Sequence, residues 1–216
     1  MALPDFSFEN KLHKLGYKLI AGVDEVGRGS FAGPVVAGAV ILNNQIYKSA
    51  NLQIKINDSK KLSKKQREVA DKWIRKNAIA FGIGQASVAQ INKFGIKKAT
   101  EIAFRKAIKN CGIRIDYLLI DAFYIPYVKG LRRKNQKAII KGDSKSVSIA
   151  AASIIAKVYR DDLMTRLSKQ SKYKKYSWHK NMGYGTKDHR NAIQKYGATK
   201  LHRKLFVRNC VSSQVE

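Results

Sequence analysis

The chain has 216 residues, with 43 Lys or Arg and 15 Asp or Glu, which gives a formal net charge of +28. An excess of this size favours a polyanionic partner such as nucleic acid, although a solvated basic surface, a ribosome-associated protein or a protein bound at a membrane surface would share it. The sequence has no window of about 18 continuous apolar residues, so it predicts no segment that spans a bilayer.

The first half of the chain predicts strands joined by tight turns and followed by helices. Three apolar runs bounded by Gly, Pro or polar residues are typical of strands: 19–23, 35–42 and 79–86. Ser63 and, three residues later, Gln66 have the spacing of a capping box, so we expect a helix from there to about Lys76. Apolar residues at helical spacing predict a second helix over 95–109.

The second half predicts two more strands and a mostly helical end. The expected elements are strands at 117–120 and 138–140 and helices at 146–168 and 186–197. The early turns of the long helix contain a run of small residues, Ala150, Ala151, Ala152 and Ser153, which would let the helix lie close to a sheet. Thr186 is the expected N-cap of the last helix and Gly197 its end. Residues 169–180 are basic and aromatic without clear periodicity.

Strands followed by helices, with an antiparallel meander near the start, predict an α/β layered fold. The length fits one domain. Within it we expect an α/β core, residues 1–165, and a basic helical C-terminal region, residues 166–216, that closes over a groove as part of the same compact unit.

Four acidic residues follow or interrupt apolar runs: Asp24, Glu25, Asp121 and Asp143. Acidic side chains rarely lie beside a buried run unless they are paired or bind metal. In one pocket of low dielectric their charges would repel, and divalent cations would relieve that repulsion. Oxygen ligands suit Mg²⁺ or Mn²⁺, and two such ions can support phosphodiester hydrolysis.

Each acid taken alone has a simpler interpretation as a cap or turn residue. Asp143 alone is better explained as the N-cap of the helix that follows, and Asp121 alone is evenly balanced between the two interpretations. The metal hypothesis therefore depends on the whole set of acids in a very basic chain.

Motifs throughout the chain resemble the signature of the ribonuclease HII family. They occur in the family's order at residues 22–29 (GVDEVGRG), 32–36 (AGPVV), 58–63 (DSKKLS), 119–121 (LID), 141–146 (KGDSKS), 148–158, 160–161, 183–186 (GYGT) and 202–203. The resemblance covers nearly the whole chain and is highly specific.

The resemblance implies a ribonuclease H-like fold, with a mixed central sheet flanked by helices. It implies an endonuclease that hydrolyses the RNA strand of RNA–DNA hybrids and cuts on the 5′ side of single ribonucleotides in duplex DNA. The implied catalytic and metal-binding residues are Asp24, Glu25, Asp121 and Asp143, with two Mg²⁺ or Mn²⁺ ions. The implied substrate-binding residues contact the ribose or its phosphates: Gly27, Arg28, Gly29, Lys60, Ser144 and Tyr184.

The chain departs from the common family pattern at a few positions, where Val26, Ser30 and Ala122 replace Ala, Pro and Gly. None of these changes removes a functional group. The related ribonuclease HIII usually carries an extra N-terminal domain and a glutamate as the fourth acid. Here the fourth acid is Asp143, which favours ribonuclease HII of the bacterial type.

Two other functions would share part of this pattern. A DNA nuclease or integrase of the same fold would use the metals but would not test for ribose, which the Gly-Arg-Gly turn and Tyr184 argue against. A non-enzymatic basic binder would need neither metals nor the four acids. We expect RNA–DNA hybrids and ribonucleotide-containing duplex DNA as partners of a monomer, with no membrane and no protein partner.

The cysteines and the N-terminus bear on where the protein works. Cys111 and Cys210 lie far apart with no metal-like spacing, and the four histidines are scattered, so no structural zinc is expected. The first ten residues lack the pattern of a signal peptide. We therefore expect a cytoplasmic protein whose cysteines are reduced and packed.

Overall fold

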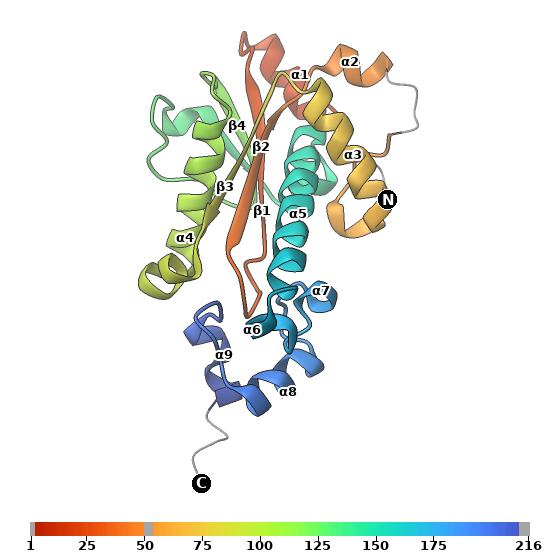
Figure 1. Ribbon diagram of the computed structural model, residues 1–216. Helices are drawn as coiled ribbons and strands as arrows, with labels where there is room; N and C mark the ends of the chain where they lie inside the picture. The colour runs from red at the N-terminus through yellow and green to blue at the C-terminus, as the bar shows by residue number, and fades with distance from the viewer. Residues whose placement is uncertain (1–2, 50–53, 212–216) are drawn as a thin grey trace.

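The computed structural model describes residues 3–49 and 54–211 (Figure 1). Within these ranges the strands form one mixed sheet in the order β3-β2-β1-β4-β5. They are β1 (Ile20–Val26), β2 (Val35–Ile41), β3 (Ala80–Ala86), β4 (Tyr117–Asp121) and β5 (Gln136–Ile139). The first three strands form an antiparallel meander, whereas β4 pairs parallel with β1 and β5 pairs parallel with β4. The predicted mixed sheet of an α/β fold is therefore confirmed.

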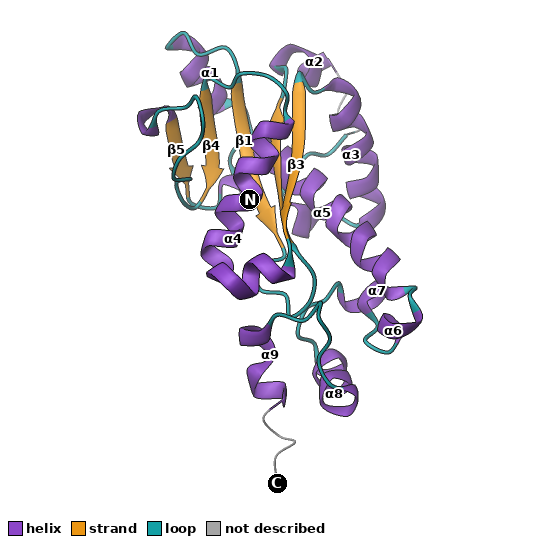
Figure 2. Ribbon diagram, turned by 60° about the vertical axis from the view of Figure 1, so that its left-hand side comes forward, coloured by secondary structure: helices purple, strands orange, loops and turns teal. Residues whose placement is uncertain are grey.

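Helices cover both faces of the sheet and form the C-terminal part (Figures 1 and 2). Those near the sheet are α1 (Ser7–Lys14), α2 (Asn44–Ser49), α3 (Lys64–Asn77), α4 (Val88–Asn110) and α5 (Val147–Ser168). Those beyond the end of α5 are α6 (Ser171–Lys174), α7 (Trp178–Asn181), α8 (Lys187–Tyr196) and α9 (Lys204–Val211). Helix α4 lies on one face of the sheet, and α5 with α3 lies on the other (Figure 1). None of the described helices is long and apolar enough to cross a membrane.

Helix α5 packs against the sheet at backbone distance because two glycines face it. A Cβ atom on Gly22 would lie 2.1 Å from the carbonyl carbon of Ser148, and one on Gly38 would lie 2.3 Å from the carbonyl oxygen of Ala152. Any side chain at either glycine would push the helix away from the sheet. Helix α5 therefore lies close to the sheet, as its small residues predicted. This packing places the turn before α5 near the ends of β1 and β4.

Several predicted element ends are wrong, each for a local reason. Helix α4 begins at Val88 rather than near Gly95, because Ser87 and Gln90 form a capping box of their own. Gly95 interrupts α4 with a φ of 78°, a left-handed value that glycine adopts easily. Strand β5 begins at Gln136, two residues before the predicted apolar run.

The predicted start of α3 is confirmed, since Ser63 and Gln66 form the reciprocal hydrogen bonds of a capping box. Thr186 caps α8 as predicted, through the backbone N–H of His189. Helix α5 runs across the expected boundary at residue 165 without interruption. The two cysteines, Cys111 and Cys210, are both free and buried, as predicted for packing residues.

Candidate active site

Three carboxylates meet at the edge of the sheet. Asp24 lies near the end of β1, Asp121 ends β4, and Asp143 lies in the 3-10 turn Gly142–Ser144 that follows β5. Because β1 and β4 are parallel neighbours, their C-terminal ends lie at the same end of the sheet. One carboxylate oxygen from each of the three residues lies within 4.8 Å of the others. The structure therefore brings together three of the four acids singled out in the sequence.

Backbone amides and one lysine hold the three carboxylates in place. Asp24 Oδ1 accepts a hydrogen bond of 2.7 Å from the N–H of Glu25. Asp121 Oδ1 accepts one of 2.7 Å from the N–H of Gly142, which ties the end of β4 to the turn that carries Asp143. The Nζ atom of Lys60 lies 3.9 Å from Asp143 Oδ2. Asp143 does not cap α5, because the side chain of Ser146 does so.

Burial and mutual repulsion disfavour the ionised forms of these carboxylates when no cation is bound. Burial, followed by repulsion from Glu25 and Asp121, raises the pKa of Asp24 well above its usual value. Burial and the nearby carboxylates of Asp58 and Asp121 also raise the pKa of Asp143. A set of hard oxygen donors that repel one another fits divalent cations such as Mg²⁺ or Mn²⁺.

Glu25 lies beside the three carboxylates but outside the group. It follows Asp24 on a strand, so the two side chains leave opposite faces of the sheet. Its Oε1 atom lies 3.2 Å from a guanidinium nitrogen of Arg28, and its Oε2 atom is buried without a hydrogen-bond partner. Burial raises the pKa of Glu25, and Arg28 offsets part of that rise.

A groove of about 600 Å³ opens next to the carboxylates. It is lined by Asp24, Glu25, Val26, Gly27, Arg28, Gly29, Ser59, Lys60, Arg67, Ser153, Lys157 and Tyr184. Tyr184 and Lys60 therefore line the same groove as the Gly-Arg-Gly turn. Ser144 is not among its lining residues, although Lys61 Nζ lies 3.4 Å from its hydroxyl.

Two groove cations, Arg67 and Lys157, were not singled out as site residues from the sequence. Lys157 lies one helical turn after Ser153 on α5, so the two side chains share a face of the helix. That four-residue spacing is the sequence pattern that could have indicated Lys157 as a groove residue. Arg67 is tied to the backbone carbonyls of Ser59 and Leu62, which fixes the Ser59–Lys61 turn beside the groove.

Comparison with known proteins agrees with the motifs and the geometry. A family model described as Ribonuclease HII matches residues 21–209. A ribonuclease HII of Wolbachia sp. subsp. Brugia malayi is 52% identical over 207 residues, which cover 95% of this chain and 94% of the relative. The chain belongs to the ribonuclease HII family.

Solved structures show the same fold. The ribonuclease HII in a complex with PCNA from Archaeoglobus fulgidus is 22% identical, with a TM-score of 0.72 over 92% of this chain and 98% of that chain. Bst-RNase HIII in complex with Mn²⁺ is 21% identical, with a TM-score of 0.66 over 93% of this chain and 71% of that chain. As a member of the ribonuclease HII family, the chain is a metal-dependent endoribonuclease that acts on RNA–DNA hybrids.

The first helix, α1, supports the turn that carries Asp143. Glu9 of α1 is buried, and its Oε1 atom accepts hydrogen bonds from the hydroxyl of Ser146, at 2.7 Å, and from the N–H of Ser148, at 3.2 Å. A carboxylate at the N-terminus of α5 is favoured by the free N–H groups there. Asp5 also exchanges backbone hydrogen bonds with Lys145, just before α5, and with Val147, the first residue of α5.

A buried chain of hydrogen bonds holds the backbone of Tyr184. The Nδ1 atom of His189 lies 2.9 Å from the carbonyl oxygen of Tyr184, so it carries the hydrogen and donates it. Its Nε2 atom then accepts from the indole N–H of Trp178, at 3.0 Å, and from Nε2 of His202, at 3.1 Å. His202 Nδ1 in turn accepts from the N–H of Thr199. Each imidazole is therefore neutral with one defined tautomer.

These histidines should make the protein less stable in acid. Burial, with repulsion from His189, lowers the pKa of His202 from 6.5 to about 4. The unfolded chain therefore takes up a proton as the pH falls below 6.5, whereas the folded chain does not until about pH 4. Neutral His202 therefore contributes fully to the free energy of unfolding above pH 6.5. At pH 5 that free energy is lower by about 2 kcal/mol.

Urea denaturation of the wild type and of His202→Gln at pH 7 and pH 5 measures this effect. The free energy of unfolding of the wild type should fall more steeply toward pH 5 than that of the variant. The same substitution at the exposed His13 is the control and should leave the wild-type slope unchanged. Equal slopes in wild type and His202→Gln would show that His202 is not held neutral.

Proposed function

We propose that this member of the family hydrolyses the RNA strand of RNA–DNA hybrids and also cuts 5′ of a single ribonucleotide in duplex DNA, leaving a 3′-hydroxyl and a 5′-phosphate. The observation that carries the proposal is the group of three carboxylates, with oxygens within 4.8 Å of one another, beside a groove lined by four cations. Two divalent ions held there, Mg²⁺ or Mn²⁺, would supply an activated water and neutralise the leaving oxygen.

The protein residues would divide the work as follows. Asp24, Asp121 and Asp143 would hold the cations, with Glu25 as a fourth acid at the rim. Their buried, mutually repelling charges support this role. The side chain of Lys60 is 82% exposed next to Asp143, so it can reach a substrate phosphate while it partly balances the acids.

The Gly-Arg-Gly turn and Tyr184 would select ribose. Gly27 has a φ of 87°, and a Cβ atom on Gly29 would meet nothing within 4 Å, so the backbone at this turn is open to a close approach by a sugar. The 2′-hydroxyl is the group that distinguishes RNA from DNA, and Tyr184 would stack on the sugar next to it. Ser144 would contact a phosphate beside Asp143.

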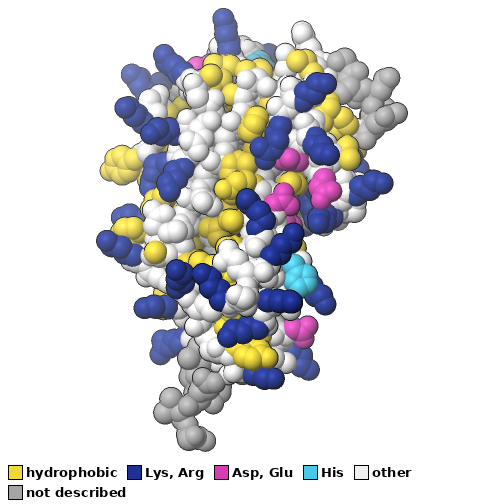
Figure 3. Space-filling view, in the orientation of Figure 1, with side chains coloured by type: hydrophobic (Ala, Val, Ile, Leu, Met, Phe, Trp, Pro, Cys, Tyr) yellow, Lys and Arg dark blue, Asp and Glu magenta, His cyan; other side chains and the backbone are white. Residues whose placement is uncertain are grey.

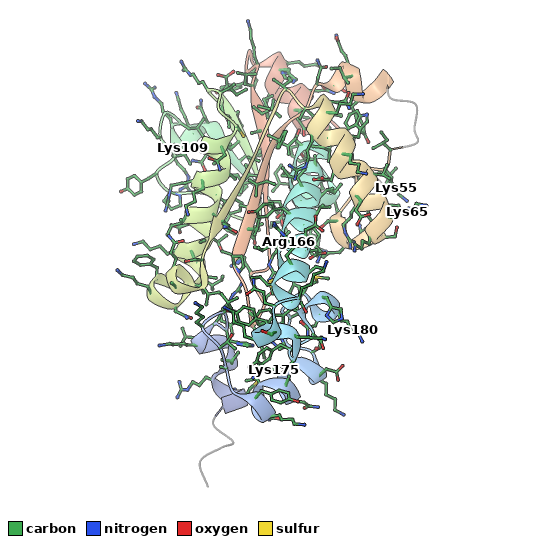
Figure 4. All side chains as sticks on the ribbon, in the orientation of Figure 1. Lys55, Lys65, Lys109, Arg166, Lys175 and Lys180 are labelled. Atoms are coloured by element: carbon green, nitrogen blue, oxygen red, sulfur yellow. The ribbon has the colours of Figure 1, made fainter. Side chains whose placement is uncertain are left out.

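The basic C-terminal region, residues 166–216, would close the substrate groove. Lys and Arg side chains spread over both the sheet-containing part and the helical part of one face, with few acidic side chains between them (Figure 3). Lys175 and Lys180 lie in the helical part, and Lys109 lies on the α4 flank (Figure 4). Both parts of this face therefore carry positive charge that can contact a nucleic acid.

Neutralising Lys172, Lys174 and Lys175 to Gln should flatten the salt dependence of binding. Each phosphate contact contributes about 0.9 to the slope of log Kd against log salt concentration, so the slope should decrease by about 2 to 3. The matched control neutralises Lys97, Lys98 and Lys109 on α4, on the other face of the sheet from α5. An unchanged slope in the first variant would place the nucleic-acid contact elsewhere.

Cleavage assays on three matched duplexes test the proposal: an RNA–DNA hybrid, a DNA duplex with one ribonucleotide, and the same duplex without it. Each is incubated with Mg²⁺, with Mn²⁺ or with a chelator. We expect cleavage of the first two, only with metal. Equal cleavage of the all-DNA duplex would identify a DNA nuclease of the same fold, and binding without cleavage would identify a plain nucleic-acid binder.

A further inference from the structure

One arginine connects the two elements that the proposed function assigns to ribose selection. Arg160 lies on α5 and is fully buried. Its guanidinium donates to three backbone carbonyls: Pro34 at 3.0 Å, Ala32 at 3.1 Å and Met182 at 2.9 Å. The first two belong to the segment after the Gly-Arg-Gly turn, and the third belongs to the loop that carries Tyr184.

Arg160 also touches both elements directly. A Cβ atom on Gly27 would lie 2.1 Å from its Nε atom, so the turn rests against the side chain. The carbon of its guanidinium lies 5.5 Å from the centre of the Tyr184 ring, within the range of a cation–π contact. The side chain of Arg160 thus packs against both the turn at Gly27 and the ring of Tyr184.

This position is costly for a cation. Arg160 has no carboxylate within ion-pair distance among the described residues, and burial lowers its pKa. A second buried guanidinium, that of Arg203, donates to the carbonyls of Arg28 and Gly33 in the same segment. An apolar side chain in place of Arg160 would avoid burying a charge but would leave three carbonyls without a donor.

We propose that Arg160 is a positioning residue that sets the separation between the turn at Gly27 and the ring of Tyr184, so that both meet the same ribose. The proposal rests on the proposed role of Tyr184 in selecting ribose. Its physical reason is that a guanidinium fixes three acceptors in one plane, whereas a lysine ammonium would hold them without that geometry. A misplacement of about 1 Å at a reacting site can cost about 100-fold in rate.

A double-mutant cycle tests the proposal, because positioning through Tyr184 predicts non-additive effects. The variants are Arg160→Lys, Tyr184→Ala and their combination, assayed on the duplex with one ribonucleotide. Arg160→Lys alone should lower kcat about 30-fold and change KM less than about 3-fold. In the Tyr184→Ala background, the same substitution should change kcat by less than about 3-fold. Arg114→Lys, at an exposed position between α4 and β4, makes the same exchange outside the groove and should match the wild type.

Additive effects in the cycle, or an Arg160→Lys variant as active as the wild type, would overturn the proposal. A Tyr184→Ala variant with wild-type kcat would also overturn it, since the position of the Tyr184 ring would then have no effect on the reaction. If Arg160→Lys does not fold, the cycle is run with Arg160→Gln, which keeps two N–H donors. Failure of the proposed function itself gives a different result, in which the wild type does not cut the duplex at the ribonucleotide.

Discussion

Asp24→Asn should lower the cleavage rate at saturating Mg²⁺ by at least about 10³-fold and leave the fold intact. Asp24 is buried, and one carboxylate oxygen each of Asp121 and Asp143 lies within 4.8 Å of one of its own. An amide is nearly isosteric with a carboxylate but loses the charge that attracts a divalent ion. Asp143→Asn should be milder if that residue holds only the second ion.

The unfolding temperature separates this effect from damage to the fold. In the presence of a chelator, Asp24→Asn should melt no lower than the wild type, because the substitution removes one of several repelling buried charges. Adding Mg²⁺ should raise the melting temperature of the wild type more than that of the variant. The exposed Asp162→Asn is the matched control and should be as active as the wild type. Near-normal turnover by Asp24→Asn would refute the metal assignment.

Tyr184→Ala should lower the cleavage rate at a single ribonucleotide by about 10²-fold and weaken binding of the same duplex by less than about 3-fold. The ring is half-buried in the groove and rests on Arg160, while His189 holds its backbone carbonyl. A rigid ring of this kind aligns the sugar, and alignment affects the transition state more than the bound ground state.

Tyr184→Phe separates the ring from its hydroxyl. If stacking is what matters, the phenylalanine variant should keep most of the activity and the alanine variant should not. Cleavage and binding are measured on the same labelled duplex, with single-turnover kinetics and with Ca²⁺ in place of Mg²⁺ for binding. A Tyr184→Ala variant that loses affinity and rate in equal proportion would show that the ring contributes binding alone.

Much of the fold was predictable because its signals are local. The capping box at Ser63 and Gln66, the N-cap at Thr186 and the small residues at the start of α5 each act within a few residues of their own position. The meeting of Asp24 and Asp121 was predictable for a related reason, since acids at the ends of parallel strands reach one edge of a sheet.

The placement of Glu25 was harder to predict, because strand β1 continues through it. Side chains alternate between the two faces along a strand, so the side chain of Glu25 points away from that of Asp24. This follows only because β1 extends to Val26, beyond the predicted end at residue 23. The supports of the site could not be predicted from local patterns at all. Glu9 contacts Ser146 across 137 residues, and Arg160 reaches Pro34 across 126. Only the folded chain brings such pairs together.

The most direct test of the account is the map of the cut in a DNA duplex that carries one ribonucleotide, incubated with the wild-type protein and Mg²⁺. We predict a single cut on the 5′ side of the ribonucleotide, with a 3′-hydroxyl on one fragment and a 5′-phosphate on the other, because a water and not the 2′-hydroxyl attacks the phosphorus. Mass spectrometry of the two fragments identifies both termini. A 2′,3′-cyclic phosphate, or equal cutting of the duplex without the ribonucleotide, would contradict it.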